Sequence, residues 1–493
     1  MTVTDAIEKK KETQSSGNHP SVTGDCEIGL IGLGVMGRNF LLNIADHGYA
    51  VAGYDKEGSQ VDALAKEKNG QEIYSANKIE DFLDSLRTPR AILMLVPAGK
   101  AVDSVIDDLQ GHLEPGDVLI DAGNSYFKDT NLRAKRLSKK GIHYLGVGVS
   151  GGEEGARHGP SIMPGGPKEA YERVRPLLEA AAAHVDGKPC VAHLGPGSAG
   201  HFVKMVHNGI EYGIMQIIAE CFHLMKSGAG LDDDQIHQIF SDWNQGELQS
   251  FLVEITGRIF NRKDKKTGKP LIDIILDVAK QKGTGMWTSQ SAMELEVPTP
   301  VIDTAVAMRN LSTYEQERDR ASAVLDRKPV TFQSDTDAFV RQLEEAVLVA
   351  MIIAYSQGFA LLRKSSSKYS FDLDLSVVAR IWKGGCIIRS ALLEDIQNAF
   401  KKNPDLPNLL LDPVISKTVV ESQEGLRVIV SEACLLGIPA PAFMATLGYL
   451  DGYRSAWLPA NLIQAQRDYF GSHCYERVDS KGTYHTEWED AAK

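Results

Sequence analysis

The sequence lacks several features that would assign it to common classes of protein. Its six cysteines are scattered at positions 26, 190, 221, 386, 434 and 474 and form no CxxC pair. This pattern favours reduced thiols over a disulfide framework or a zinc site. The chain also lacks a basic excess, since its formal net charge is −12. We therefore expect no general binding of nucleic acid or membrane surfaces.

Long apolar segments are missing too. No uninterrupted apolar run reaches the roughly 20 residues that a membrane span needs. Residues 1–26 are polar, contain "EKKKETQSSGNHPS" and lack the apolar core of a secretory signal. We interpret them as a flexible tail and expect a cytoplasmic protein.

The 493 residues are enough for two or three domains. Residues 27–197 alternate short β-rich runs with charged helical segments, the β-rich runs being "EIGLIGL", "AVAGYD", "AILMLV", "VLIDAG" and "YLGVGV". This alternation predicts an α/β domain of the Rossmann type, with a mostly parallel sheet covered on both faces. Residues 198–455 carry long amphipathic runs without strand signals and predict a large all-helical domain. Residues 456–493 form a C-terminal tail.

The helical part contains a candidate internal duplication. "IHQIFSDWNQGELQSFLVEI" resembles "LSVVARIWKGGCIIRSALLEDI", with Trp243 aligned to Trp382. In the second copy the positions that correspond to a polar stripe at 204–212, described below, are nearly all apolar. They are Leu343, Ala346, Val347, Ala350 and Met351 in one register, or Val347, Ala350, Met351, Ala354 and Tyr355 in the other. A packed helix of this kind therefore does not need polar residues there.

Three segments match G-x-G-x-x-G: "GLGVMG" (32–37), "GVGVSG" (146–151) and "GPGSAG" (195–200). Only the first follows a predicted strand, opens a helix and leads to a second strand that ends in an acid, Asp55. This context predicts a dinucleotide site. Gly32 allows the turn, Gly34 lets backbone N–H groups approach a pyrophosphate, and Gly37 lets helix and strand pack closely. Leu33, Val35 and Met36 complete the motif.

Asp55 indicates which dinucleotide fits. A carboxylate at this position accepts hydrogen bonds from a ribose 2′-hydroxyl and repels a 2′-phosphate, which favours NAD over NADP. The alternative is an Asp that only caps a turn. Lys56 could still bind a phosphate.

Two further glycine loops have other roles. In "VSGGEEGARHGPSIMPGG", Ser150, Gly151 and Gly152 follow a predicted strand and expose a hydroxyl and backbone N–H groups. Such a loop suits a carboxylate or hydroxyl of a small substrate, the alternative being a flexible connection. "GPGSAG" is expected to bring the helix that follows it close to the sheet.

That helix, "GHFVKMVHNGIEYG" (200–213), has polar residues where an apolar stripe is expected. Lys204, His207, Asn208, Glu211 and Tyr212 span an arc of roughly 140°. Burying Lys, His and Glu without partners would cost several kcal/mol each. The stripe therefore predicts the floor of a cleft that binds a polar ligand, with perturbed pKa values. A solvated face or a satisfied structural network is the alternative.

Seven segments together are identified as those of a known family. "IGLGVMGRN", "IDAGNS", "GVSGGEEGARHGPSIMPGG", "GHFVKMVHNGIEYG", "QKGTGMW", "GGCIIRS" and "LIQAQRDYFGSH" resemble the decarboxylating 6-phosphogluconate dehydrogenases, within the β-hydroxyacid dehydrogenase group. The resemblance runs from about residue 27 to the C-terminus. It implies oxidative decarboxylation of 6-phosphogluconate to ribulose 5-phosphate in the pentose phosphate pathway, without a metal.

The resemblance also implies roles for individual residues. Lys204 would be the base at the substrate's 3-hydroxyl, and Glu211 the acid that protonates C1 of the enediol. Residues that position the carboxylate and hydroxyls would be Asn124, Ser150, Gly151, Gly152, His207 and Asn208. Residues that grip the sugar and its phosphate would be Tyr212, Lys282, Arg309, Arg467 and His473. Residues that line the cofactor would be Met36, Val96, Pro97, Ala98 and Asn124. The tail would enter the partner subunit, so that a homodimer shares its active sites.

The sequence departs from the family at the cofactor. NADP-dependent members usually have Asn-Arg-Thr where this chain has Asp55, Lys56 and Glu57, so use of NAD, even preferred use, is expected beside the family's NADP. Pro97 and Met286 also stand where lysines are usual. Two rival interpretations are a relative that acts on an unphosphorylated β-hydroxyacid, and a nucleotide-sensing protein that has lost catalysis. The first should lack the predicted phosphate cluster, and the second should have lost Lys204 or Glu211.

Overall fold

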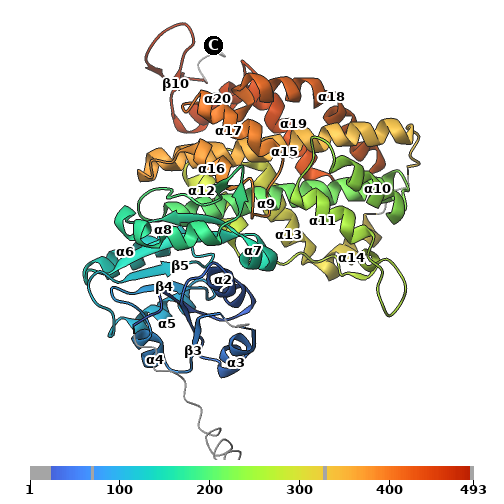
Figure 1. Cartoon of the computed structure of the whole chain (residues 1–493). Helices are drawn as coiled ribbons and strands as arrows, with labels where there is room; N and C mark the ends of the chain where they lie inside the picture. Colours follow the sequence, from blue (N-terminus) through green and yellow to red (C-terminus); the bar gives the residue numbers. More distant parts are fainter. Residues whose placement is uncertain (1–23, 68–70, 326–329, 489–493) are drawn as a thin grey trace, which may run out of the picture.

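The computed structural model describes residues 24–67, 71–325 and 330–488 (Figure 1). Most of the predicted flexible N-terminal tail, 1–23, lies outside these residues. Figure 1 shows the sheet domain in blue and cyan at the bottom of the view, and the helical domain, green to red, above it.

The N-terminal domain is built on one seven-stranded sheet. Its strands are β1 (Ile28–Ile31), β2 (Val51–Tyr54), β3 (Ile73–Ala76), β4 (Ala91–Met94), β5 (Val118–Asp121), β6 (His143–Ser150) and β7 (Ser161–Gly165). They lie in the order β3-β2-β1-β4-β5-β6-β7. The first six are parallel, and β7 runs antiparallel to β6. The order 3-2-1-4-5-6 is that of the Rossmann fold, which confirms the predicted fold class.

Helices cover both faces of this sheet. They are α2 (Val35–Asp46), α3 (Gly58–Glu67), α4 (Ile79–Asp84), α5 (Lys100–Leu109), α6 (Phe127–Ser138), α7 (Gly152–His158) and α8 (Lys168–Ala181). One apolar layer contains Phe40 of α2 and Leu178 of α8. The opposite layer contains Ile106 of α5 and Leu137 of α6. The central strands β1, β4 and β5 are completely buried because both of their faces are covered.

The sequence analysis did not predict the strands β3 and β7 or the short helix α7. Strand β3 lies at the edge of the sheet, and two of its four residues are only half-buried, so its apolar signal is weak. The segment after Ser150 is not a plain loop. Gly151 and Gly159, with φ of 111° and 130°, bound the short helix α7, and β7 then pairs with β6. A strand as short as "SIMPG" between glycines and prolines gives no clear alternation.

The helical domain is built around two long helices that pack against each other, α9 (Ala199–His223) and α15 (Thr336–Tyr369). Its helices are α9 (Ala199–His223), the π-helical turn η1 (Leu224–Gly228), α10 (Asp233–Trp243), α11 (Phe251–Phe260), η2 (Leu271–Ile274), α12 (Thr284–Glu294), α13 (Pro300–Ser312), α14 (Glu315–Val324), α15 (Thr336–Tyr369), α16 (Leu375–Ile381), α17 (Leu392–Lys402), η3 (Leu409–Leu411), α18 (Pro413–Leu436) and α19 (Pro441–Arg454). A short hairpin, β8 (His184–Val185) and β9 (Lys188–Pro189), precedes them. Helix α9 packs against α12, α13 and α15 and also against β6 and β7, so it joins the two domains.

Helix α15 is long and apolar enough to cross a membrane by length and composition alone, with a mean hydropathy of 1.7 over 18 residues. However, 89% of that segment is buried inside the protein. This is the environment of a core helix.

The internal duplication remains a proposal, supported by corresponding contacts. Trp243 ends α10 and Trp382 directly follows α16, and both indoles are buried. Seven and eight residues further on, Ser250 and Ser390 pair in an antiparallel bridge. A two-fold relation between the copies would bring equivalent segments together in this way.

The C-terminal segment contains α20 (Ala460–Gly471) and a hairpin of β10 (Tyr475–Glu476) and β11 (Thr483–Tyr484). Figure 1 draws it at the top of the view, away from the blue sheet. Among the described residues, every hydrogen bond recorded for a side chain of this segment joins two residues between 461 and 488. Its apolar side chains are largely exposed, Trp457 at 68% and Phe470 at 72%. The segment is therefore held by its own contacts and leaves an apolar surface uncovered.

A buried carboxylate connects α9 to α19. Glu220 is 3% exposed, and its Oε1 and Oε2 accept hydrogen bonds from the backbone N–H groups of Ala442 and Phe443, 2.9–3.1 Å away. Gln216 donates to Oε1 at 2.9 Å. Glu220 thus supplies the cap that Ala440, the residue before α19, cannot provide. These donors stabilise the charged carboxylate, but burial has the larger effect and raises the pKa of Glu220 to about 7.

This raised pKa predicts a pH-dependent stability. Because the folded-state pKa lies above the unfolded value, the contribution of Glu220 is complete below about pH 4.5 and is lost as the pH rises through 7. Relative to Glu220→Gln, the wild type should lose about 2 kcal/mol of unfolding free energy between pH 5 and 8. Urea unfolding of both proteins at each pH measures the difference. Parallel curves would contradict it.

Candidate functional site

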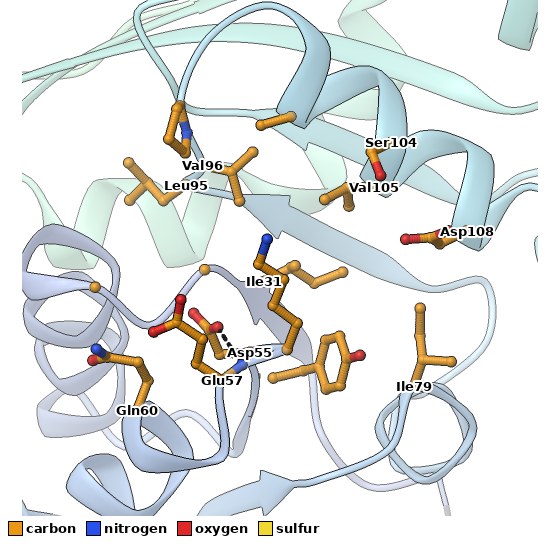
Figure 2. A pocket seen from close by; sticks show the side chains of 16 residues that line it. Ile31, Asp55, Glu57, Gln60, Ile79, Leu95, Val96, Ser104, Val105 and Asp108 are labelled. Carbon is orange, nitrogen blue, oxygen red and sulfur yellow. Dashed lines mark hydrogen bonds between the residues drawn. The ribbon is translucent and has the colours of Figure 1, made fainter.

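A cleft of about 440 Å³ lies at the carboxyl ends of β1, β2 and β4 (Figure 2). Its residues come from the glycine turn, the end of β2 and helix α5. They are Ile31, Gly32, Gly34, Tyr54, Asp55, Lys56, Glu57, Gln60, Ile79, Leu95, Val96, Pro97, Ala101, Ser104, Val105 and Asp108. Parallel sheets of this kind bind ligands at this edge, beside helix N-termini.

The glycines of the turn fit a dinucleotide. A Cβ at Gly34 would meet no atom within 4 Å, so the backbone there is open to a ligand in the cleft. A Cβ at Gly37 would lie 1.8 Å from the carbonyl oxygen of Gly32, so only glycine permits this contact of helix and turn. Both glycines have the surroundings that the fingerprint requires.

Asp55 is fixed at the entrance to this turn. Its Oδ2 accepts the N–H of Leu33 at 2.7 Å, and its Oδ1 accepts the N–H of Glu57 at 2.9 Å. Each carboxylate oxygen keeps a further lone pair, so Asp55 can still accept from a ribose hydroxyl. Figure 2 shows Asp55, Glu57 and Gln60 on one side of the cleft and Asp108 across it.

Charge around the cleft is mainly negative. Three carboxylates line it, those of Asp55, Glu57 and Asp108, against one ammonium, that of Lys56. Arg38 lies next to the turn, but its guanidinium donates to Glu67, Gln60 and the carbonyl of Leu33. The field of the cleft disfavours an additional phosphate.

The predicted cofactor residues divide into two groups. Those lining the cleft are Gly32, Gly34, Asp55, Lys56, Glu57, Val96 and Pro97. Those outside its lining are Leu33, Val35, Met36, Gly37, Ala98 and Asn124. Leu33 and Gly37 are buried and support the turn, whereas Ala98 and Asn124 are exposed on the turns that follow β4 and β5. Sequence reasoning missed Tyr54, Gln60, Ser104 and Asp108, which belong to no motif.

The polar stripe on α9 is buried. Lys204 is 6% exposed, and His207, Asn208 and Tyr212 are also buried, while Glu211 is partly exposed. The alternative of a solvated face is therefore wrong for these residues. A Cβ at Gly148 of β6 would lie 2.3 Å from the Cβ of Lys204. A Cβ at Gly200 would likewise lie 2.4 Å from the carbonyl oxygen of Gly146, so "GPGSAG" lets the helix lie close to the sheet as expected, and the glycines of "GVGVSG" contribute to this packing as well.

Hydrogen bonds connect the stripe to a neighbouring helix and loop. Lys204 Nζ donates to Asn208 Oδ1 at 2.5 Å and lies 3.5 Å from His207 Nδ1. Asn208 Nδ2 donates to Thr284 Oγ at 3.1 Å, which turns its oxygen toward Lys204. His207 Nε2 lies 3.2 Å from the Ser150 hydroxyl. The loop at Ser150 and the stripe therefore form one site.

Burial shifts the pKa values of this group. Desolvation lowers the pKa of Lys204, opposed by the negative charge of Glu211. Desolvation raises the pKa of Glu211, opposed by Lys204 and Arg309. The pKa of His207 is well below its usual value because of burial and the nearby Lys204. A lysine with a lowered pKa and a glutamate with a raised pKa within one site are suited to proton transfer near neutral pH.

Some of the predicted phosphate ligands gather beside the stripe. The Arg309 guanidinium stacks on Tyr212, 3.6 Å from the ring centroid. It donates to the carbonyl of Lys280, in the segment that leads to the exposed Lys282. Arg467 belongs to α20, and His473 lies two residues past its end; both are exposed, and Arg467 donates to Gln464. Within this chain no recorded contact joins these two residues to the stripe.

Sequence reasoning gave no role to three residues that hold the site. Thr284 orients Asn208, although it lies inside "QKGTGMW". The N–H of Ile387 donates to Ser150 Oγ at 3.5 Å. The Trp382 ring meets His207 edge-on, with centroids 5.6 Å apart. These contacts come from segments far apart in the sequence, so no local spacing could reveal them.

Together, a Rossmann-type cleft and a buried Lys–Glu pair define a nucleotide-dependent dehydrogenase. Comparisons with known proteins give the particular family. The model "NAD binding domain of 6-phosphogluconate dehydrogenase" matches residues 27–195, and "6-phosphogluconate dehydrogenase, C-terminal domain" matches residues 200–488. The chain belongs to the 6-phosphogluconate dehydrogenase family.

Individual relatives agree with this assignment. The NADP(+)-dependent, decarboxylating 6-phosphogluconate dehydrogenase of Bacillus subtilis (strain 168) is 51% identical over 94% of this chain and 99% of its own length. The decarboxylating enzyme of Escherichia coli (strain K12) is 46% identical over the same shares. A structure of the Plasmodium falciparum 6-phosphogluconate dehydrogenase covers 94% of this chain and all of that chain, with 42% identity and a TM-score of 0.91. These relatives confirm the family and the class of reaction inferred from the motifs.

Proposed function

We propose that the chain converts 6-phosphogluconate to ribulose 5-phosphate and CO₂, with Lys204 and Glu211 as its proton-transfer pair. The observation that carries these roles is that the buried Lys204 and the partly exposed Glu211 lie on one face of α9, beside the Ser150 loop and the Tyr212–Arg309 stack. A nicotinamide cofactor, when bound, accepts the hydride from C3 of the substrate. The place of this reaction is the pentose phosphate pathway, in the cytoplasm.

Lys204 handles the proton of the 3-hydroxyl. Its lowered pKa provides the neutral amine that can accept this proton as C3 is oxidised to a ketone. The ketone is β to the carboxylate, so the C1–C2 bond breaks and its electron pair enters an enediolate, without a metal. Lys204 then returns its proton to the C3 oxygen. Among the described residues, no group of three or more His, Cys, Asp or Glu could hold a metal ion.

Glu211 completes the reaction. Its raised pKa favours the form that carries a proton. After CO₂ departs, this proton goes to the carbon that carried the carboxylate, which is C2 of the substrate and C1 of the enediol and the product. The other residues of the site hold the substrate: Asn124, Ser150, Gly151, Gly152, His207 and Asn208 bind its carboxylate and hydroxyls. Ser150 can donate or accept because a hydroxyl does both.

The phosphate is bound by cations from two subunits. In this chain Arg309 stacks on Tyr212 of the stripe and donates to the carbonyl of Lys280, two residues before Lys282. Arg467 and His473 are supplied by the partner in a homodimer, since the recorded hydrogen bonds of their segment's side chains, within the part of the chain that the structure describes, join residues of the segment itself, and its apolar side chains are largely exposed. A phosphate dianion held by several charge-assisted donors separates this substrate from unphosphorylated β-hydroxyacids. The surviving Lys204 and Glu211 disfavour a merely nucleotide-sensing role.

The cofactor is a nicotinamide dinucleotide, and we propose that NAD is used in preference to NADP. Asp55 lines the cleft at the end of β2, where folds of this type bind the ribose hydroxyls, and Glu57 and Asp108 add negative charge to the same cleft. Lys56 supplies one positive charge, which leaves residual affinity for the 2′-phosphate. The NADP dependence in the name of the Bacillus relative belongs to that protein.

Lys204→Met tests the base. Methionine keeps the stem that packs on Gly148 and removes the amine. Turnover of 6-phosphogluconate should fall about 100- to 10,000-fold. The melting temperature should not fall, because methionine keeps the apolar stem and no polar amine is then buried. Reduced nicotinamide and released CO₂ are measured together, and near-normal turnover would eliminate Lys204 as the base.

A hybrid dimer tests the shared site. Lys204→Met and Arg467→Ala subunits, each with its own affinity tag, are coexpressed and isolated as mixed dimers. If the tail serves the partner, one of the two sites contains both native residues, and activity returns relative to either homodimeric variant. A tail that serves its own subunit would leave both sites defective, so an inactive hybrid would overturn the proposal.

Replacing Asp55, Lys56 and Glu57 by Asn, Arg and Thr tests the cofactor preference. The change removes two carboxylates and adds a guanidinium, which can form charge-assisted bonds with a 2′-phosphate. The ratio of kcat/KM for NADP to that for NAD should rise by about tenfold to a hundredfold. A wild type that already strongly prefers NADP at saturating 6-phosphogluconate would contradict our interpretation of Asp55.

A further inference from the structure

A buried carboxylate at the end of β5 lies behind the candidate site. Asp121 is completely buried. Its Oδ2 accepts the hydroxyls of Ser125 at 2.6 Å and Tyr144 at 2.9 Å, and its Oδ1 accepts the N–H of Gly123 at 3.1 Å. Gly123 and Ser125 flank Asn124, the exposed residue of this turn. Asp121 therefore fixes the turn that presents Asn124.

Arg133 of α6 extends this network to the neighbouring turn. Its Nη1 lies 3.6 Å from Asp121 Oδ2 and 3.4 Å from Ser125 Oγ. Its Nη2 donates to the carbonyl of Gly99 at 3.0 Å, directly after Pro97 and Ala98. Asp103 accepts from Nε at 2.7 Å and from Nη2 at 3.1 Å. One buried guanidinium thus joins the turns that follow β4 and β5.

His201 connects the same strand end to the first turn of α9. Its Nε2 lies 3.0 Å from the carbonyl oxygen of Asp121, and its Nδ1 lies 2.7 Å from the Thr130 hydroxyl. Burial lowers the pKa of His201, so the ring is neutral and carries one hydrogen. A carbonyl can only accept, so Nε2 carries that hydrogen and Nδ1 accepts from Thr130. His201 lies one helical turn before Lys204.

The network therefore reaches three pieces of the proposed site: the Asn124 turn, the 97–99 turn and the start of α9. We propose that Asp121 is a positioning residue, which sets the placement of Asn124 and of the 97–99 turn relative to Lys204. The inference rests on the proposed function, since these three pieces meet the substrate only if the reaction is the one assigned. Asp121 itself touches no substrate in this account.

A carboxylate suits this position because all of its neighbours donate. Two hydroxyls, one backbone N–H and one guanidinium face Asp121. An asparagine has a single oxygen, and its NH₂ would have to donate to the hydroxyls instead. Asp121→Asn keeps the size of the side chain, reverses hydrogen bonds at the turn and removes the charge opposite Arg133. A misplacement of about 1 Å at a reacting group can lower turnover about 100-fold.

The same strand offers a matched control. Asp117, at the opposite end of β5, is also buried and accepts the N–H groups of Arg90 and Glu114. Its Oδ2 lies 3.4 Å from the Arg90 guanidinium. Asp117→Asn therefore removes a comparable buried charge at the amino end of the strand, away from the ligand edge of the sheet.

The experiment compares Asp121→Asn, Asp117→Asn and the wild type. Melting temperature, the Kd of the cofactor, and kcat and KM for 6-phosphogluconate are measured for each. Asp121→Asn should lower kcat about 10- to 100-fold. Its cofactor Kd should change much less than kcat, because the pyrophosphate and ribose contacts at Gly34 and Asp55 lie outside the network and only the 97–99 turn of the cleft lies within it. Asp117→Asn should lose similar thermal stability and keep the wild-type kcat.

Equal kcat values for the two variants would overturn the inference, as would losses of kcat that follow melting temperature alone. If Asp121→Asn does not fold, Tyr144→Phe and Ser125→Ala each remove one donor and leave the carboxylate in place. Both should then lower kcat, and wild-type kcat in both would equally overturn the inference. A wild type without turnover of 6-phosphogluconate would instead remove the proposed function, so the two failures are distinguishable.

Discussion

The candidate site depends on keeping the amine of Lys204 out of water. A lysine on a solvated helix face would hold its proton firmly near neutral pH and could not act as a base. Here α9 lies so close to β6 that the stem of Lys204 fills the space above Gly148. The amine then meets only a few polar atoms, chiefly Asn208 Oδ1 and His207 Nδ1. The burial of Lys204 in the polar stripe is thus a consequence of the close packing of α9 on β6, which only glycine at position 148 allows.

Once the amine is desolvated, its surroundings must be fully specified. Thr284 orients Asn208, and His207 lies between Ser150 and Trp382. Burial raises the pKa of Glu211. These partners come from α12, β6 and the segment after α16. The large helical domain therefore does more than cover the sheet. It supplies the polar atoms that a buried Lys, His and Glu need.

The sequence predicted features that local spacing encodes. The G-x-G-x-x-G turn, Asp55 at the end of β2 and the Lys204–Tyr212 stripe all follow from periodicity and context, and the fold class followed from alternation. The roles of Glu220, Asp121 and Trp382 in holding the structure were not predicted, because a lone buried polar or aromatic residue leaves no repeating signal. Glu220 and its partner Ala442, for example, are 222 positions apart. Strand β7 was not predicted, because the glycines and prolines around it hide its short apolar pattern. Only the resemblance to the family suggested a role for Arg467 and His473.

The contact between α9 and the sheet also bears on how such proteins can be recombined. A Cβ at Gly200 would lie 2.2 Å from the carbonyl oxygen of Met163 and 2.4 Å from that of Gly146. A helical domain grafted onto another nucleotide-binding sheet would therefore fit only if that sheet kept small residues along its last two strands. The two halves are not interchangeable modules, and chimeras should be cut elsewhere than at the start of this helix.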